Sequence, residues 1–316
     1  MNMNRPWLSH YPAGVAHDVQ PEQYRSLATL LEESLRKNAR QPVSVCMERW
    51  MSYGELDQHS AALGAWLQAK GLAPGARVAI MLPNVPQFLV AMAAVVRAGY
   101  TVVNVNPLYT ARELEHQLKD SGAEAIVILE NFAHTLEEVI DVTQLRHVVV
   151  ASLGDLLGFW YGRWISFAVR HLAKLVPAYK LPVTGVLGPR TISSFRQALA
   201  EGSSQTLKPS LAQADDIAFL QYTGGTTGLS KGAVLTHRNI IAAVLQAEAW
   251  FQPALARVGD IRVVNAIAAL PLYHIFALTL SLLTMRWGAH MTLIPNPRDV
   301  PKLVETLKRR PFHLLP

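Results

Sequence analysis

Cysteine is nearly absent from this chain of 316 residues, which contains Cys46 alone. A single thiol excludes an internal disulfide and a cysteine-rich metal site. Cys46 stands between Val45 and Met47, so we expect a small buried side chain and not a nucleophile. The N-terminus also lacks a charged stretch followed by an apolar one, which argues against a secretory signal and favours the cytoplasm.

Acidic residues are missing from 156–200, although the chain has 23 of them and a net charge of +6. The six cations of this stretch are Arg163, Arg170, Lys174, Lys180, Arg190 and Arg196. Removing these six from the total of 29 cations leaves 23, which equals the number of acids. The basic charge therefore belongs to one local surface, and nucleic acid is not an expected partner.

A long uninterrupted apolar run is also missing. The nearest approach is 266–285, which is broken by Pro271, Tyr273 and His274. A membrane-spanning helix needs about 20 consecutive apolar residues. We therefore expect a buried strand, a loop and a buried helix in this stretch.

The patterns that are present indicate an α/β fold with parallel sheets flanked by helices. From about residue 50 onward, short β-branched runs alternate with helical patterns, as in parallel βαβ units. Strands are expected at 78–82, 102–105, 125–129 and 147–150, and helices at 88–98 and 111–121. The sequences Ser52 to Glu55 and Thr110 to Glu113 predict capping boxes at two helix starts.

Three ranges are expected along the chain. A first α/β subdomain covers 1–155, a basic amphipathic excursion and connection covers 156–210, and a second α/β part covers 211–316. Proline and glycine gather after Val176, which supports a boundary in the middle range.

The sharpest motif is the glycine–threonine loop at 222–232, Tyr-Thr-Gly-Gly-Thr-Thr-Gly-Leu-Ser-Lys-Gly, directly after an apolar run. Glycines let backbone N–H groups converge on one point, threonines add hydroxyl donors and Lys231 adds a cation, which suits a polyphosphate. A P-loop requires Gly-Lys followed by Ser or Thr. Ser230 precedes Lys231 and Gly232 follows it, so that pattern fails.

This loop resembles the phosphate-binding signature of the adenylate-forming superfamily, whose members include acyl-CoA synthetases. The resemblance implies that the loop holds the β- and γ-phosphates of ATP and that Thr226, Thr227 and Lys231 stabilise charge on the departing pyrophosphate. The phosphate-binding residues implied are Thr223, Gly224, Gly225, Thr226, Thr227, Gly228 and Lys231. Many members have proline where this chain has Ser230.

Two further blocks carry the resemblance. The block 269–278, Ala-Leu-Pro-Leu-Tyr-His-Ile-Phe-Ala-Leu, resembles the motif at the acyl pocket and implies that Tyr273 and His274 border the substrate. Taken alone, a histidine in an apolar run is more often a core residue. The block 98–110, with Asn104 and Asn106, has a mainly structural role in the family. The amino-acid sequences of these blocks most resemble those of bacterial long-chain fatty-acid–CoA ligases.

The resemblance implies a ligase that joins a fatty acid to ATP and then to coenzyme A, with Mg²⁺ as a cofactor. The family's later adenine, ribose and magnesium motifs, and its small domain with a catalytic lysine, have no counterpart before Pro316. We therefore expect an incomplete N-terminal portion that is inactive alone, with no metal ligand of its own. The alternative is a catalytically defective remnant that binds only nucleotide or acyl chain. The sequence leaves open whether the chain forms a homodimer.

The stretch 156–176 predicts an amphipathic helix. Its apolar stripe consists of Leu157, Trp160, Tyr161, Trp164, Ile165, Ala168, Leu172 and Leu175. Arg163, Arg170 and Lys174 fall on another face. Tryptophans opposite cations are typical of a helix at a membrane surface, whereas a helix packed on the protein body is the alternative.

Overall fold

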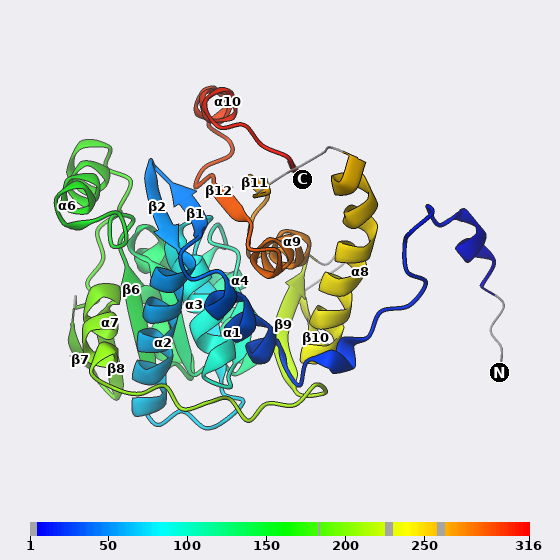
Figure 1. Cartoon of the computed structure of the whole chain (residues 1–316). Coiled ribbons are helices and arrows are strands. Elements are labelled where there is room, and N and C mark those ends of the chain that lie inside the picture. The colour runs from blue at the N-terminus through cyan, green and yellow to red at the C-terminus, as the bar shows by residue number, and fades with distance from the viewer. Residues whose placement is uncertain (1–4, 183, 225–229, 258–262) are drawn as a thin grey trace.

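The fold is built around an eight-stranded sheet in which six central strands are parallel and an antiparallel strand closes each edge (Figure 1). The computed structural model describes residues 5–182, 184–224, 230–257 and 263–316. In sheet order the strands are β10 (Lys231–Thr236), β9 (Ile217–Thr223), β4 (Thr101–Asn104), β3 (Arg77–Met81), β5 (Ala125–Leu129), β6 (His147–Ala151), β8 (Arg190–Ser194) and β7 (Gly185–Leu187).

A second, four-stranded sheet joins distant parts of the chain. Its order is β11 (Asn265–Ala268), β12 (His290–Leu293), β1 (Pro42–Cys46) and β2 (Arg49–Ser52). The first three of these strands are parallel, and β2 returns antiparallel to β1. Both sheets therefore take strands from widely separated segments, which confirms the α/β class with parallel sheets.

The helices cover both faces of the larger sheet. The α-helices of the described ranges are α1 (Leu27–Lys37), α2 (Tyr53–Ala69), α3 (Pro86–Arg97), α4 (Ala111–Ser121), α5 (Ala133–Glu137), α6 (Phe159–Phe167), α7 (Phe195–Ser203), α8 (His237–Arg257), α9 (Ile275–Arg286) and α10 (Val300–Arg309). Of these, α6 and α10 lie at the margin of the molecule, away from the larger sheet (Figure 1). Short 3₁₀ turns lie at Pro6–His10, Pro21–Gln23, Glu130–Phe132 and Ile140–Val142, and a π turn lies at Ala168–Leu172.

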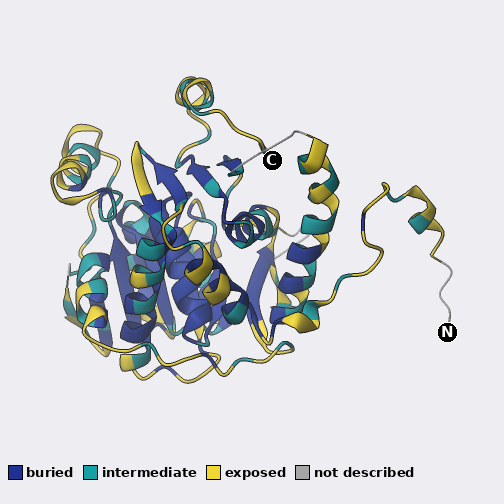
Figure 2. Cartoon of the chain, in the orientation of Figure 1, coloured by how far each residue is buried: buried dark blue, intermediate teal, exposed yellow. Residues whose placement is uncertain are grey.

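Side chains that alternate along the central strands divide the interior into two cores. In β3, Val78 and Ile80 pack in the core with α1, α2, α3 and α9, whereas Ala79 and Met81 pack in the core with α4 and α5. This is the period of two that a strand covered on both faces requires. Every residue of α3 is buried, and Figure 2 shows the helices around it buried on their inner sides.

Local predictions hold in detail. Both capping boxes form: Ser52 N–H donates to Glu55 Oε2 at 2.7 Å, and Thr110 N–H donates to Glu113 Oε2 at 2.8 Å. Burial raises the pKa of the Cys46 thiol to about 12, so this residue is a small apolar side chain as expected. The stretch 266–285 forms β11, a loop and α9, and no helix within the described ranges is long and apolar enough to cross a membrane.

The amphipathic segment differs from its prediction in three ways. The α-helix is α6, which begins at Phe159 and passes into the π turn at Ala168, so it is shorter than 156–176. Leu157 is buried and does not belong to an exposed stripe. Arg170 is not a free cation either, because it forms an ion pair with the buried carboxylate of Glu130.

Candidate functional site

The glycine–threonine loop connects β9 and β10. Thr223 and Gly224 are exposed at the end of β9, and Lys231 is exposed at the start of β10. Thr223 and Lys231 are direct partners in the antiparallel pair, so Lys231 lies beside the point where the loop leaves β9. The predicted residues Gly225, Thr226, Thr227 and Gly228 lie outside the described residues.

This loop lies at the carboxyl edge of the parallel strands. β9 runs parallel to β4, with Asn104 opposite Gln221, and the loop follows directly after β9. Ligands in open α/β sheets bind in the crevice beyond the carboxyl ends of the strands. The sheet therefore places the two described ends of the loop, 222–224 and 230–232, at an edge where a ligand can bind.

A chain of side-chain amides connects the loop's strand to the predicted substrate segment. Gln117 Nε2 donates to the carbonyl of Asn104 at 2.7 Å, and Asn104 Nδ2 donates to Gln221 Oε1 at 3.2 Å. Gln221 Nε2 then donates to the carbonyl of Tyr273 at 3.0 Å. Asn104, Gln117 and Gln221 are all buried. These bonds fix the distance between the loop and the segment that carries Tyr273 and His274.

His274 is an exposed residue and not a core histidine. It caps α9, where its Nδ1 accepts from the N–H of Phe276 at 3.4 Å. Tyr273 is half-buried, and burial, with a smaller contribution from nearby Tyr109, raises its pKa. The structure thus brings the two predicted substrate residues to the carboxyl edge, next to β9.

Asn84 has a positioning role that the sequence reasoning missed. Its side chain donates to the carbonyls of Ala268 at 2.8 Å and Leu270 at 2.9 Å, and it accepts from the N–H of Leu272 at 2.8 Å. It follows β3, just as Asn104 ends β4. Polar side chains at the ends of neighbouring apolar strands were the signal that could have identified both residues.

The far side of the glycine–threonine loop is anchored on α4. The Nε2 of His116 lies 2.9 Å from the carbonyl oxygen of Ser230, the residue before Lys231. Tyr222, at the other side of the loop, donates to Asp120 Oδ2 at 2.5 Å. Residues at both ends of the loop, Tyr222 and Ser230, are therefore bonded to one helix.

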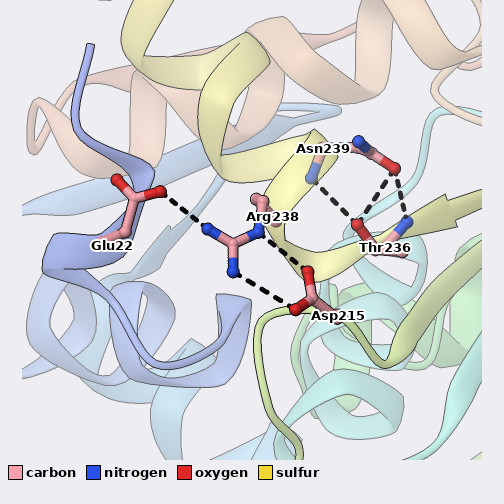
Figure 3. A network of polar contacts seen from close by, with 5 residues as sticks. All are labelled: Glu22, Asp215, Thr236, Arg238 and Asn239. Atoms are coloured by element: carbon pink, nitrogen blue, oxygen red, sulfur yellow. Dashed lines mark hydrogen bonds and ion pairs between the residues drawn. The ribbon is translucent and has the colours of Figure 1, made fainter.

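An ion-pair network holds the end of β10 (Figure 3). Arg238 contacts Glu22 at 2.7 Å and Asp215 at 2.8 Å, so it joins the N-terminal segment to the approach to β9. Beside it, Thr236 and Asn239 bond to each other at the start of α8. All of these side chains are partly exposed, so the network orients the chain more than it stabilises it.

The apolar space beside the substrate segment is small. A cavity of about 20 Å³ lies between β11 and α9, with Ala268, Leu272 and Ala277 among its lining residues. That volume is about the size of one water molecule. This cavity is therefore too small to hold a long acyl tail.

Residues 31–316 match the family described as AMP-binding enzyme. The chain is 48% identical, over 98% of its length, to a long-chain-fatty-acid–CoA ligase of Escherichia coli O157:H7, of which it covers 54%. It is 29% identical, over 98% of its length, to the Bacillus subtilis enzyme of the same name, of which it covers 53%. The chain thus spans about half the length of these curated relatives.

Solved structures agree on the fold. The anthranilate CoA ligase AuaEII, in complex with anthranoyl-AMP, superposes with a TM-score of 0.72 at 19% identity, covering 94% of this chain and 51% of that one. A long-chain-fatty-acid-CoA ligase from Archaeoglobus fulgidus gives a TM-score of 0.70 at 22% identity, covering 95% and 52%. At these identities the likeness establishes the architecture alone.

Proposed function

The chain belongs to the AMP-binding enzyme family, and we propose that it supplies the ATP-phosphate site and part of the acyl side of a long-chain fatty-acid–CoA ligase. The observation that carries this proposal is the position of the glycine–threonine loop. The loop leaves β9 at the carboxyl edge of the sheet, and Gln221 of β9 is bonded to the segment of Tyr273 and His274. The hydrogen bond between Gln221 and Tyr273 would thus hold the phosphate site of ATP close to the acyl site.

The proposed reaction has two steps. The fatty-acid carboxylate attacks the α-phosphorus of ATP, which gives acyl-AMP and releases pyrophosphate. The thiol of coenzyme A then attacks the acyl carbon and displaces AMP. The substrate supplies the first nucleophile, so the protein's task is positioning and charge stabilisation. Lys231, together with Thr226 and Thr227, stabilises the negative charge that develops on the departing pyrophosphate.

Mg²⁺ is assigned to the substrate in this proposal. The part of the chain that the structure describes contains no group of three or more His, Cys, Asp or Glu side chains arranged to hold a metal. A magnesium ion that arrives on the phosphate oxygens of ATP needs few protein ligands. The phosphate site and the exposed Lys231 are compatible with such a complex.

The test is ATP–pyrophosphate exchange with and without oleate. Because the chain covers about half the length of its curated relatives, we expect it alone to bind ATP without exchange above background. A protein of the relatives' full length that contains this chain is expected to show exchange that depends on oleate and that acetate does not support. Absence of exchange in that longer protein would instead match the binding-only alternative. The Lys231→Ala variant shows whether the observed exchange belongs to this loop.

A peripheral membrane contact through 156–176 is a further part of the proposed function. It is supported by the exposed aromatic side chains of α6, since tryptophan and phenylalanine partition to the interface of a bilayer. Changing both Trp160 and Trp164 to serine is expected to reduce co-sedimentation with lipid vesicles. Equal sedimentation of the variant and the unchanged chain would contradict the contact.

A further inference from the structure

The surface of α6 is unusual in how much aromatic area it leaves in contact with solvent. Trp160 is 81% exposed and Trp164 is 57% exposed, and Phe159, Tyr161 and Phe167 are exposed beside them. Figure 2 shows this helix at the margin of the molecule with little of it buried. A large exposed apolar patch of this kind marks an interaction surface.

α6 is held rigidly against the protein body. The backbones of Gly154 and Gly162 lie so close that a Cβ built on Gly154 would be 1.9 Å from the Gly162 carbonyl oxygen. At the other end, Arg170 pairs with the buried Glu130, and Asn131 Nδ2 donates to the carbonyl of Leu175 at 2.8 Å. The aromatic side chains are therefore presented by a fixed helix.

Fewer cations around α6 lack an acidic partner than the sequence suggests. Arg170, Arg190 and Arg196 each pair with an acid from outside the acid-free stretch, namely Glu130, Asp141 and Asp155. Arg163 forms no ion pair with any residue that the structure describes, and its guanidinium lies 5.7 Å from the centre of the Phe159 ring. Within α6 itself, Arg163 is thus the one cation, and no described acid neutralises it.

Arg163 shares a hollow of about 260 Å³ with Ser166, Asp155 and Arg196. The carboxylate there is already occupied: Asp155 Oδ1 accepts from Arg196 Nε at 2.9 Å, and Oδ2 accepts from the N–H of Ser152 at 2.7 Å. Arg196 also donates through Nη2 to the carbonyl of Gly154 at 3.1 Å, which leaves its Nη1 without a partner in the described chain. The hollow therefore has a net positive charge, two guanidinium groups and a hydroxyl.

We propose that Arg163, Ser166 and Arg196 form a binding site for the phosphate of an anionic phospholipid headgroup, at the rim of the aromatic surface of α6. Arginine donates in a planar fork that matches phosphate, and a hydroxyl adds a third donor. Aromatic side chains in the headgroup layer bring the hollow to the depth of the lipid phosphates. The site rests on the membrane contact in the proposed function and specifies which lipid that contact selects.

The experiment measures co-sedimentation of the chain with two kinds of vesicle, phosphatidylcholine alone and phosphatidylcholine mixed with phosphatidylglycerol. The chain is expected to bind the mixed vesicles more tightly. Arg163→Gln is expected to lower that affinity about fivefold, the loss for one cation at an anionic surface, and to leave binding to phosphatidylcholine unchanged. Arg163 contacts no described acid, so this variant keeps the fold, which thermal unfolding verifies.

The matched control is Lys180→Gln, which removes one exposed cation from the same basic stretch outside the hollow. Equal losses for the two variants would overturn the site, because the attraction would then be diffuse. Displacement from mixed vesicles by inorganic phosphate at the concentration of the lipid phosphate would overturn the lipid as the source. ATP binding on the same preparations is expected to stay unchanged, which separates failure of this site from failure of the ligase proposal.

Discussion

The side-chain Nε2 of Gln221 donates to the backbone carbonyl of Tyr273 at 3.0 Å, and the side-chain Oε1 of Gln221 accepts from Asn104 Nδ2 at 3.2 Å. One buried side chain thus joins three segments, which are β4, the strand before the glycine–threonine loop and the segment that carries His274. The spacing between the proposed phosphate and acyl sites depends on this residue.

Replacing Gln221 by leucine tests that dependence. The variant leaves the Asn104 amide and the Tyr273 carbonyl without their partners in a buried place, which costs about 1–3 kcal/mol of unfolding free energy for each group left unsatisfied. Urea unfolding measures the change. The exposed Gln205→Leu is the control, with an expected change within about 0.5 kcal/mol. Similar values for the two variants would show that the connection contributes no stability.

Asn84→Leu is expected to destabilise the substrate segment more than the rest of the fold. It removes three hydrogen bonds to the stretch from Ala268 to Leu272, and a loss of about 2 kcal/mol or more is expected. Amide hydrogen exchange of that stretch should become faster than exchange in β5, which Asn84 does not bond. Unchanged protection at Leu272 would contradict the positioning role.

Lys231→Ala tests the proposed phosphate contact. A charge-assisted bond to phosphate contributes about 1.5–3 kcal/mol, so ATP affinity is expected to fall tenfold or more. Lys231 is exposed and its backbone pairs with Thr223, so the hairpin is preserved in the variant. Calorimetry with Lys308→Ala, an exposed lysine on α10, provides the control. Equal ATP affinities for the two variants would remove Lys231 from the site.

Acid should destabilise the protein through His237. Its Nδ1 accepts a hydrogen bond from the N–H of Leu27 at 3.2 Å, and burial lowers its pKa to about 4 from an ordinary value of 6.5. A lowered pKa means that the stabilisation is present above about pH 6.5 and is lost as the pH falls through 4. His147 shifts in the same direction, also to about 4, mainly through burial.

The measurement is the unfolding free energy between pH 7 and pH 4, for the unchanged chain and for His237→Gln. The variant should lose up to about 3 kcal/mol less over this range, because it has no imidazole to protonate. Parallel curves for the two proteins would rule out His237 as the group responsible.

Asp155 should act in the opposite direction. Burial raises the pKa of its carboxyl to about 6, although Ser152 and Arg196 favour the charged form. A raised pKa means that its contribution is complete below about pH 3.8 and is lost as the pH rises through 6. Asp155→Asn should therefore weaken the loss of unfolding free energy that occurs as the pH rises from about 3.8 through 6. An unaltered profile in that region would exclude Asp155 as a titrating group.

The sequence by itself determined the local elements and the fold class. A capping box needs only the residues from Ser52 to Glu55, or from Thr110 to Glu113, so neighbouring residues contain all of the information. The same is true of β5, which occupies the predicted 125–129, because a doubly covered strand is a continuous apolar run. The phosphate-binding role of the glycine–threonine loop was also inferred from consecutive residues, the eleven of 222–232, and it stays a prediction.

Tertiary structure alone decided which polar groups meet. Asn84 bonds residues 184 to 188 positions away, Gln221 reaches Tyr273 across 52 positions, and Arg170 finds Glu130 across 40. Sheet order and register set these pairs, and neither is encoded in a short window of sequence. The same reason explains why His274 could be either a core or an exposed residue until α9 was placed, and why Arg163, alone among the arginines around α6, is left without an acidic partner in the described chain.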